Sequence, residues 1–299
     1  MRTLQEMLES SIIVIDKPAG PSSHQVTSWV ADILGTERTG HSGTLDPAVS
    51  GVLPIGTGYA VRALDVMNYL PKGYVCVMRF HSDVTPSSVD EMFGRFTGRI
   101  YQLPPVRSAV RRERRIREIY SLHLLESRDR LFLFTVTCQA GTYIRTLCRD
   151  IGEAMCAGAQ MEELRRTSAG PFTEQDAVTL QRLEDAVFYW KNGDERMLRS
   201  LLHPYERLLS SFPSIVLKDS AVDSICHGAD LTVKGVSGIN GTIRRGATIA
   251  LFTRQGEGVA IARALMSGDS ALNSGSGVVC DTLRVFMRPG TYPRFRKKQ

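Results

Sequence analysis

The sequence predicts an α+β protein with two domains: residues 1–211 form a mixed, largely antiparallel sheet with flanking helices, and residues 212–299 form a small β-barrel. Its 299 residues are 42% hydrophobic and 23% charged, which suffices for two ordinary cores. In the first part, short apolar runs alternate with segments of helical spacing. After Phe212-Pro213, short strands are separated by glycine turns such as Asn240-Gly241.

The first elements surround two irregular loops. The apolar run 12–15 is expected to be a strand that leads into the loop Asp16-Lys17-Pro18-Ala19-Gly20-Pro21. Ser22 or Ser23 can cap a following helix, which Gly35 stops. The loop GHSGTLDP, residues 40–47, comes next.

The rest of the first domain continues the alternation of helices and strands. Further helices are expected at 59–70, 86–96, 145–155 and 180–190, and a last one ends by His203. A strand is expected at 74–80, and a hairpin pairs 119–125 with 131–138 across the polar loop 126–130. For residues 164–172 we predict neither a helix nor a strand. In the second domain a short helix is capped by Asp219 and ended by His227-Gly228.

The charge of the chain is unevenly distributed. Residues 212–299 hold 12 of the 37 Lys and Arg but only 6 of the 31 Asp and Glu, so the formal net charge of +6 resides there. A basic module on an electrically balanced body suits binding of a polyanion, although surface charge for solubility explains the asymmetry equally well. Arginines also crowd residues 107–117, where they either meet phosphate or form a solvated face.

Several function classes are poorly supported. The six cysteines include no CxxC pair and the six histidines form no close ligand pattern, which argues against disulfides and metal sites. Gly56-Thr57-Gly58 is too short for a phosphate loop, and the GxSxG signature is absent. Because no signal pattern or long apolar run is present, we expect a cytoplasmic protein.

One carboxylate stands out as a candidate for chemistry. Asp46 lies in a loop with Gly40 and Gly43 before it and Pro47 after it, so a ligand can approach the main chain closely. The apolar run 48–55 could anchor this loop. Arg145, at a strand-to-helix junction, is the candidate partner of Asp46, and the alternative is a surface arginine.

Six strings in residues 16–172 resemble the RNA pseudouridine synthases of the TruB and dyskerin family. They read DKPAGPSSHQV, GHSGTLDPAVSGVLP, KGYVCVM, YQLPPVRSAVRR, AGTYIRTL and LRRTSAGPF. Farther on, LKDSAVDSICHGADL and VFMRPGTYPR are similar to the PUA-type RNA-binding domain that these synthases share with archaeosine transglycosylases. The resemblance covers nearly the full chain and is strongest to the archaeal form of dyskerin.

The resemblance implies the roles of the site residues. Asp46 matches the aspartate that attacks the target uridine, and Arg145 matches its arginine partner. Tyr74 matches the tyrosine that stacks on the base and can take the carbon-5 proton, and His41 matches a histidine near the flipped nucleotide.

Further residues are implied to shape the pocket or bind RNA. Lys17 and Leu164 match positions that shape and wall the pocket. The other expected RNA-binding residues are Arg107, Arg111, His227 and Gly228. The reaction implied needs no cofactor and no metal.

The implied function is conversion of specific uridines to pseudouridine in tRNA or rRNA. In the archaeal group this reaction takes place in a box H/ACA particle, so the implied partners are target RNA, a guide RNA and small accessory proteins, with no membrane. Two alternatives stay open: a stand-alone tRNA enzyme and a non-catalytic RNA-binding scaffold. The family's extra N-terminal segment is not evident before Asp16, which leaves open how the C-terminal domain is completed.

Overall fold

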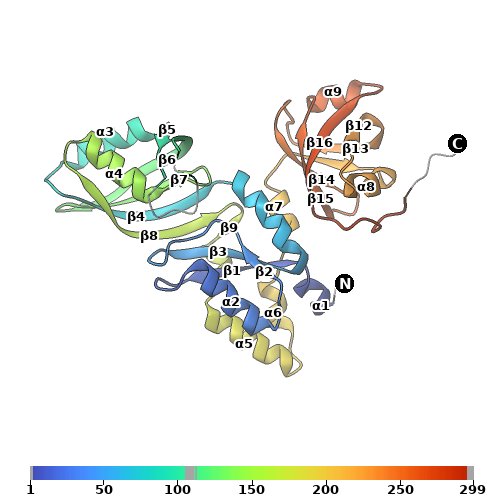
Figure 1. Ribbon diagram of the computed structural model, residues 1–299, viewed down its shortest axis with the longest axis horizontal. Coiled ribbons are helices and arrows are strands. Elements are labelled where there is room, and N and C mark those ends of the chain that lie inside the picture. Colours follow the sequence, from blue (N-terminus) through green and yellow to red (C-terminus); the bar gives the residue numbers. More distant parts are fainter. Residues whose placement is uncertain (1–2, 105–110, 112, 295–299) are drawn as a thin grey trace. The chain divides into compact units, whose positions relative to one another are not determined.

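The computed structural model describes residues 3–104, 111 and 113–294, and its chain divides into two compact units (Figure 1). The first unit comprises the chain up to Leu8 together with Ile12–Leu202, and the second comprises Glu9–Ser11 and the chain from His203 onward. The division therefore precedes the predicted boundary after residue 211. Within the second unit, the Tyr205 hydroxyl donates a hydrogen bond to the carbonyl of Gly258 (2.7 Å).

The first unit is built on a mixed, largely antiparallel sheet, as predicted. Within this unit its strands follow the order β1, β3, β8, β4, β7, β6, β5, with β2 paired to β3 and β9 paired to β8. Among these strands β3 and β8 run parallel. The strands are β1 (Ser11–Lys17), β2 (Thr39–His41), β3 (Ser50–Thr57), β4 (Lys72–Phe80), β5 (Gly98–Gln102), β6 (Arg115–Arg128), β7 (Leu131–Cys138), β8 (Ala159–Ala169) and β9 (Phe172–Thr173).

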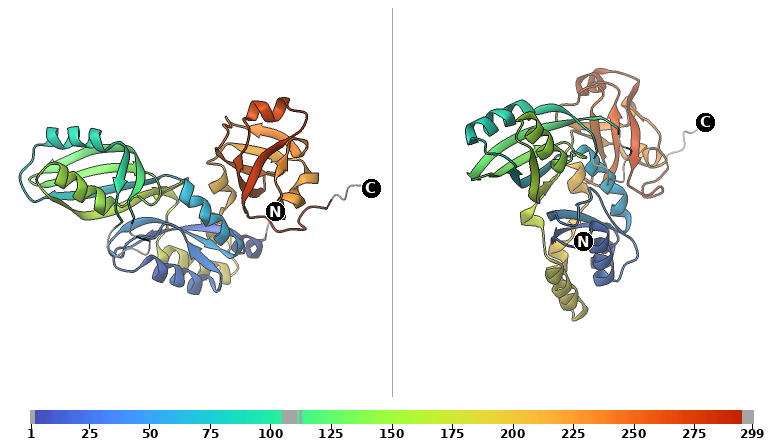
Figure 2. Two further views of the ribbon diagram at one scale, coloured as in Figure 1. Left: turned by 45° about the horizontal axis from the view of Figure 1, so that its top comes forward. Right: turned by 60° about the vertical axis from the view of Figure 1, so that its left-hand side comes forward.

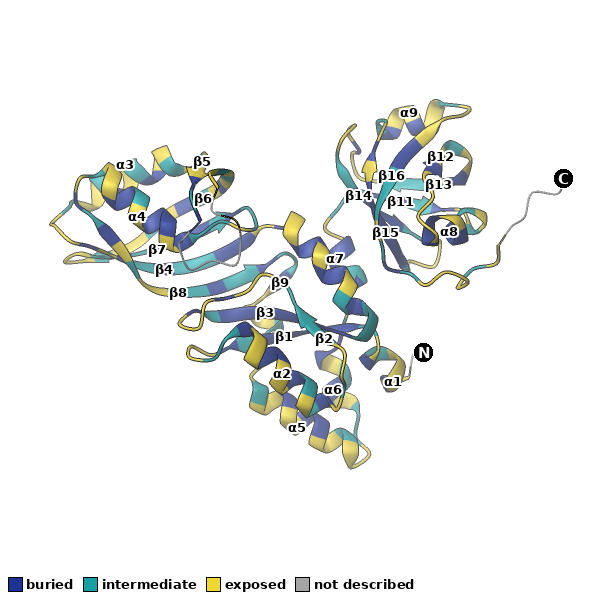
Figure 3. Cartoon of the chain, in the orientation of Figure 1, coloured by how far each residue is buried: buried dark blue, intermediate teal, exposed yellow. Residues whose placement is uncertain are grey.

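Helices cover two parts of this sheet. They are α1 (Leu4–Leu8), α2 (Ser23–Leu34), η1 (Gly58–Tyr69), α3 (Pro86–Phe96), α4 (Ile144–Ala154), η2 (Glu174–Asp176), α5 (Leu180–Lys191) and α6 (Arg196–Leu201). One core joins α3 and α4 to β4, β6 and β7, and a second core joins α1, α2, α5 and α6 to β1 and β3. Helices α2 and α5 lie side by side (Figure 2), and their outer faces are exposed (Figure 3).

The second unit is a smaller β-rich body with its own core. Its six-stranded sheet follows the order β12, β16, β15, β14, β11, β13 and forms a half-barrel. The remaining elements of the chain are β10 (His203–Pro204), α7 (Glu206–Leu209), β11 (Ser214–Leu217), α8 (Asp219–Cys226), β12 (Leu231–Thr232), η3 (Val233–Gly235), β13 (Val236–Asn240), β14 (Thr248–Phe252), β15 (Gly258–Ala264), α9 (Gly268–Asn273) and β16 (Val278–Val285).

The expected helix after the first loop is confirmed. The Ser22 hydroxyl accepts a hydrogen bond from the Gln25 N–H at the start of α2, and Gly35 ends the helix in the left-handed conformation. The helix expected at 59–70 forms instead as the 3-10 helix η1, which packs closely on β2 and β3. At Gly40, for example, an added Cβ would lie 2.8 Å from Val61 Cγ1.

Three other local expectations are wrong. The hairpin strands extend to Arg128 and Leu131, which pair directly, so Asp129 and Arg130 alone form the turn in place of a five-residue loop. Residues 164–169 belong to strand β8, between β3 and β4. Asp219 is the first residue of α8, and Lys218 occupies the cap position.

Among the described residues, no helix is both long and apolar enough to cross a membrane.

Candidate active site

The loop that carries Asp46 is held at its backbone and leaves its carboxylate accessible. Leu45 and Val49 are buried, and their side chains anchor the loop. The Ser23 hydroxyl donates to the Leu45 carbonyl (3.1 Å) and accepts from the Leu45 N–H (2.9 Å). The Gly20 N–H donates to the Pro47 carbonyl (2.8 Å). The first loop, DKPAGP, thus fixes the position of the second.

Lys17 belongs to this scaffold. Its side chain is fully buried, and its Nζ donates to the carbonyls of Pro18 (2.7 Å) and Pro47 (3.1 Å). Burial lowers the pKa of Lys17, and the positive charge of Arg166 lowers it further. Lys17 is not among the residues that line the adjacent cavity. This arrangement supports a role in holding the loop and not a direct contact with RNA.

Asp46 and Arg145 form an ion pair, as expected from the sequence. Arg145 lies in the first turn of α4, and the start of this helix is fixed by the buried side chain of Gln102. Gln102 Nε2 donates to the Tyr143 carbonyl (3.1 Å), and its Oε1 accepts from the Tyr143 N–H (3.0 Å). About half of each charged side chain is exposed, 53% for Asp46 and 47% for Arg145, so a ligand can reach the pair from solvent.

Asp46, Arg145, Tyr74 and Leu164 line one cavity of about 560 Å³ in the first unit. Tyr74 comes from β4 and Leu164 from the neighbouring strand β8. Burial raises the pKa of Tyr74, and the positive charge of Arg166 opposes this shift. The other lining residues are His24, Gly43, Thr44, Leu45, Val49, Met67, Asn68, Lys72, Ala140, Gly141, Thr142, Tyr143, Ile144, Met161 and Arg166.

Two buried cations in this cavity were not predicted. Lys72 is 4% exposed and Arg166 is 1% exposed. Both stand in the strings KGYVCVM and LRRTSAGPF. Lys72 lies two residues before Tyr74, so strand alternation could have found it, whereas Arg166 lies on a strand that was not predicted. Arg166 is two residues from Leu164 on β8, so both face the cavity, and Arg166 pairs with Tyr74 across β4 and β8.

His41 is not among the residues that line the cavity. Its Nδ1 is hydrogen-bonded to the Thr27 hydroxyl (2.8 Å), and its ring contacts His24 edge-on with 4.7 Å between ring centroids. Burial lowers the pKa of His41, with smaller effects from His24 and Arg166. His24 lines the cavity and His41 does not. The expected contact of His41 with the flipped nucleotide stays a prediction.

The other predicted RNA-binding residues lie elsewhere. Arg107 is outside the described residues. Arg111 is highly exposed and pairs with Glu113 (2.8 Å). His227 follows α8, where its Nδ1 is hydrogen-bonded to the Asp223 carbonyl (2.8 Å), and Gly228 adopts a positive φ of 84° beside it. Both His227 and Gly228 are exposed, and their contact with RNA stays a prediction.

The cavity offers an accessible carboxylate, an aromatic ring and an apolar wall. In the described part of the chain, no group of three His, Cys, Asp or Glu is placed to hold a metal ion. A planar base could lie between Tyr74 and Leu164 with its sugar near Asp46. The geometry therefore suits attack on a nucleoside that has been flipped out of its helix.

Family comparisons match consecutive parts of the chain. The TruB family pseudouridylate synthase N-terminal domain matches residues 31–88 and 81–144, and the tRNA pseudouridylate synthase B C-terminal domain matches residues 145–210. A PUA domain matches residues 213–286. A DKCLD domain matches residues 1–27, a range that includes the DKPAG loop and the residues before it.

Individual relatives match over nearly the whole chain. A probable tRNA pseudouridine synthase B of Methanothermobacter thermautotrophicus is 47% identical over 98% of this chain and 91% of the relative. The protein of the same name from Archaeoglobus fulgidus is also 47% identical, over 99% of this chain and 91% of the relative.

Two solved structures are also similar. A chain in the crystal structure of a Cbf5-Nop10-Gar1 complex matches with a TM-score of 0.91 and 40% identity, covering 98% of this chain and 90% of that one. A chain in an H/ACA RNP bound to a substrate RNA containing 2′-deoxyuridine matches with a TM-score of 0.87 and 39% identity, with the same coverage.

Proposed function

Since the chain belongs to the TruB family of pseudouridylate synthases, we propose that Asp46 attacks the target uridine and that a box H/ACA guide RNA selects it. The enzyme is a pseudouridine synthase and carries a PUA domain. We propose which residues are its catalytic groups, that a guide RNA directs it, and that accessory proteins assist it.

The ion pair between Asp46 and Arg145 is the observation that carries the catalytic assignment. Asp46 is the carboxylate in the cavity lining, and Arg145 is aimed at it from a helix whose start is fixed by Gln102. Because the backbone on both sides of Asp46 is hydrogen-bonded, the carboxylate keeps its position while its oxygens stay accessible.

The proposed reaction rearranges one bond between base and sugar. The Asp46 carboxylate forms a bond to ribose C1′ as the bond from C1′ to uracil N1 breaks, the uracil turns within the cavity, and the bond from C1′ to C5 forms as the bond from C1′ to Asp46 breaks. The proton on C5 leaves and N1 gains one, so no atom is added or lost overall. Tyr74 is suited to stack on the base, and Leu164 walls the cavity. Because burial raises its pKa, Tyr74 carries its own proton, so it accepts the C5 proton only if a proton is passed on, with N1 as the final acceptor.

RNA recognition is proposed for several surfaces. Residues 212–299, including His227 and Gly228, would hold RNA through the PUA domain and its excess of positive charge. Arg107 and Arg111 would meet phosphates beside the target. Similarity to Cbf5 in complex with Nop10 and Gar1 supports small accessory proteins as partners. A cytoplasmic location stays a prediction.

A stand-alone tRNA enzyme is the second candidate. The observation in its favour is the name of relatives that are 47% identical, tRNA pseudouridine synthase B. A scaffold without catalysis is disfavoured, because Asp46, Arg145 and Tyr74 line one cavity.

The two candidates differ in their need for a guide. Purified protein would be incubated with target rRNA segments and with tRNA, each with and without an H/ACA guide and the accessory proteins, and pseudouridine would be measured. We expect product only with the guide. Efficient modification of tRNA by the protein alone would overturn the guided proposal, and absence of product from every mixture would favour the scaffold.

A further inference from the structure

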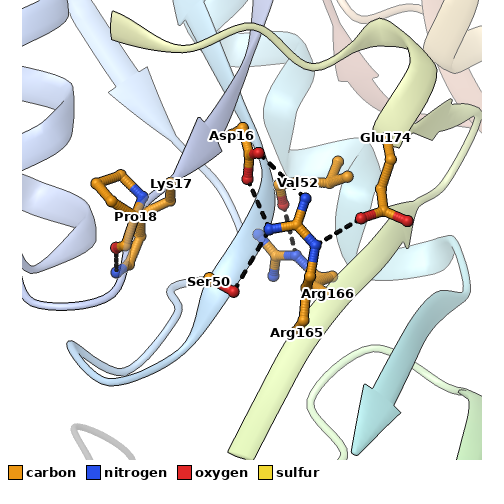
Figure 4. A network of polar contacts seen from close by, with 8 residues as sticks. All are labelled: Asp16, Lys17, Pro18, Ser50, Val52, Arg165, Arg166 and Glu174. Carbon is orange, nitrogen blue, oxygen red and sulfur yellow. Dashed lines mark hydrogen bonds and ion pairs between the residues drawn. The ribbon is translucent and has the colours of Figure 1, made fainter.

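Two adjacent arginines on β8 have different surroundings (Figure 4). Arg165 is paired with carboxylates: its guanidinium contacts both oxygens of Asp16 (2.9 and 3.1 Å) and Oε1 of Glu174 (2.5 Å). Its charge is therefore neutralised, and its role is to join β1, β8 and the segment after β9. Arg165 does not line the cavity.

Arg166 is a buried cation that pairs with no carboxylate among the described residues. Arg166 is only 1% exposed, and its guanidinium donates to the carbonyls of Val52 (2.7 Å from Nε) and Gly43 (2.6 Å from Nη1). Burial lowers the pKa of Arg166, and the neighbouring Tyr74 opposes this effect. A buried charge without a counter-charge is costly, so its retention needs a reason beyond packing.

The third nitrogen of this guanidinium, Nη2, is buried and has no acceptor at normal hydrogen-bond geometry, although the Tyr74 hydroxyl lies close enough to the guanidinium to interact with it. Arg166 lines the cavity and pairs across the sheet with Tyr74, the residue proposed to stack on the base. A buried N–H without an acceptor costs free energy until an acceptor arrives. An acceptor that enters the cavity beside Tyr74 would therefore gain a charge-assisted hydrogen bond.

Lys72 adds a second buried charge to the same cavity. Its Nζ donates to the Met67 carbonyl (2.9 Å), and it lines the cavity together with Arg166. A Cβ added at Gly43 would lie 3.2 Å from Arg166 Nη1 and 3.7 Å from Lys72 Cε. The carboxylate of Asp46 is already paired with Arg145. The inner part of the cavity consequently carries excess positive charge from Arg166, to which Lys72 adds below its pKa of about 7.

We infer that Arg166 contacts the target base directly: Nη2 donates to a carbonyl oxygen of uracil, and Arg166 and Lys72 together stabilise the negative charge on uracil while it is detached. This inference rests on the proposed isomerisation. When the C1′–N1 bond breaks, both electrons go to the uracil, where the charge spreads over N1, O2 and O4. Formation of the C1′–C5 bond, loss of the C5 proton and protonation of N1 then restore neutrality.

The test combines a change in the enzyme with a change in the substrate. Single-turnover rates would be measured with target RNA that carries uridine, 2-thiouridine or 4-thiouridine at the modified position. Sulfur is a poor acceptor, so we expect one of the two thio-substitutions to slow the wild-type enzyme about tenfold. The position that shows the loss identifies the carbonyl oxygen, O2 or O4, that Arg166 binds.

In Arg166→Lys the same thio-substitution should lower the single-turnover rate by no more than about twofold, because the proposed donor Nη2 is absent. This variant keeps the charge but lacks Nη2, and its rate with uridine should fall at least tenfold while RNA affinity stays within twofold. Arg165→Lys is the matched control, and it should retain the full thio-penalty. Lys72→Met should slow the reaction with uridine while leaving the thio-penalty in place.

Equal thio-penalties in the wild type and Arg166→Lys would overturn the inference. If Arg166→Lys does not fold, the wild-type rates alone decide, because the absence of a penalty from either thio-substitution also overturns it. Failure of the wild-type enzyme to convert ordinary uridine would instead count against the proposed function.

Discussion

In the first unit Lys17, Lys72 and Arg166 are buried, whereas every Lys and Arg described in the second unit keeps some exposure to solvent. The buried charged residue there is Asp223, whose carboxylate accepts a hydrogen bond from the Gly290 N–H (3.0 Å). Buried cations are costly, and those of the first unit surround one loop and one cavity. Exposed cations cost little free energy of folding. They attract phosphate over a distance that shortens as the salt concentration rises.

This difference separates two uses of positive charge. In the first unit, charge holds the Asp46 loop and lines the cavity, so its loss should affect catalysis or folding more than RNA affinity. In the second unit, charge should affect RNA affinity and its salt dependence more than catalysis. Each prediction below changes residues of one unit and leaves the other unit unaltered.

The largest of these effects is expected for Arg145→Ala. Removal of the cation beside Asp46 should lower the single-turnover rate at least about a hundredfold. Since about half of each side chain is exposed, the ion pair should contribute under about 1 kcal/mol to folding. Arg149→Ala, one turn along α4 with its own acidic partners Asp150 and Glu153, is the control. A similar loss of rate in both variants would contradict a specific role for Arg145.

Gly51→Ala should destabilise the first unit by a few kcal/mol. Gly51 has a φ of 104°, and an added Cβ would lie 2.2 Å from the carbonyl oxygen of Arg166 on the neighbouring strand. Gly94→Ala in α3 is the control, because an added Cβ there meets nothing within 4 Å and alanine favours helix. Unfolding would be followed by fluorescence of Trp29 and Trp190, which both report on the first unit. Equal free energies of unfolding for Gly51→Ala and Gly94→Ala would contradict the predicted clash.

Lys72→Met should stabilise the first unit more at pH 6 than at pH 9.5. Burial lowers the pKa of Lys72 to about 7. Below that pH the lysine is charged in both folded and unfolded states, so the full cost of burying the charge is present. As pH rises from 7 toward the unfolded value near 10.5, the folded state releases its proton and the cost falls. The difference between the two pH values should be on the order of a few kcal/mol.

Urea unfolding at the two pH values measures this difference. Lys191→Met, at the exposed end of α5, should have a small effect that is equal at both. If the effect of Lys72→Met is also independent of pH, the buried lysine carries no charge penalty.

The smallest effect is expected from the pair Arg244→Gln and Arg245→Gln, two exposed arginines of the second unit. Loss of one or two phosphate contacts should reduce the slope of log affinity against log salt by roughly 1 to 2. The rate at saturating RNA should not change. Arg95→Gln with Arg196→Gln, at exposed ion pairs of the first unit, controls for net charge. If the slope does not change in Arg244→Gln with Arg245→Gln, the excess of positive charge in the second unit serves solubility and not RNA binding.

Local signals predicted the parts of the fold that depend on neighbouring residues. The Ser22 cap and the Gly35 stop of α2, and the bounds 86–96 of α3, are examples. Strand β8 was missed because its partners β3 and β4 lie about a hundred residues earlier, and the sequence around Arg165 gives no local strand signal. The turn at Asp129 was misplaced because strand length is set by cross-strand pairing.

The site shows the same limit. Asp46, Arg145, Tyr74 and Leu164 were predicted from the strings that contain them, and the structure brings all four to one cavity. The contribution of Arg166 depends on burial and on its cross-strand partner, which no single string displays. Sequence reasoning also placed Lys17 at the pocket, and the structure directs two hydrogen bonds of its amine to the loop backbone.

The central claim is that the Asp46 carboxylate is the group that attacks the target uridine. The most direct measurement is single-turnover pseudouridine formation by Asp46→Asn, with guide and accessory proteins present, beside RNA affinity and thermal unfolding of the same variant. Because only the charge of one half-exposed side chain changes, we predict that folding and RNA affinity stay at wild-type levels while product formation is lost. Substantial residual turnover would contradict the account.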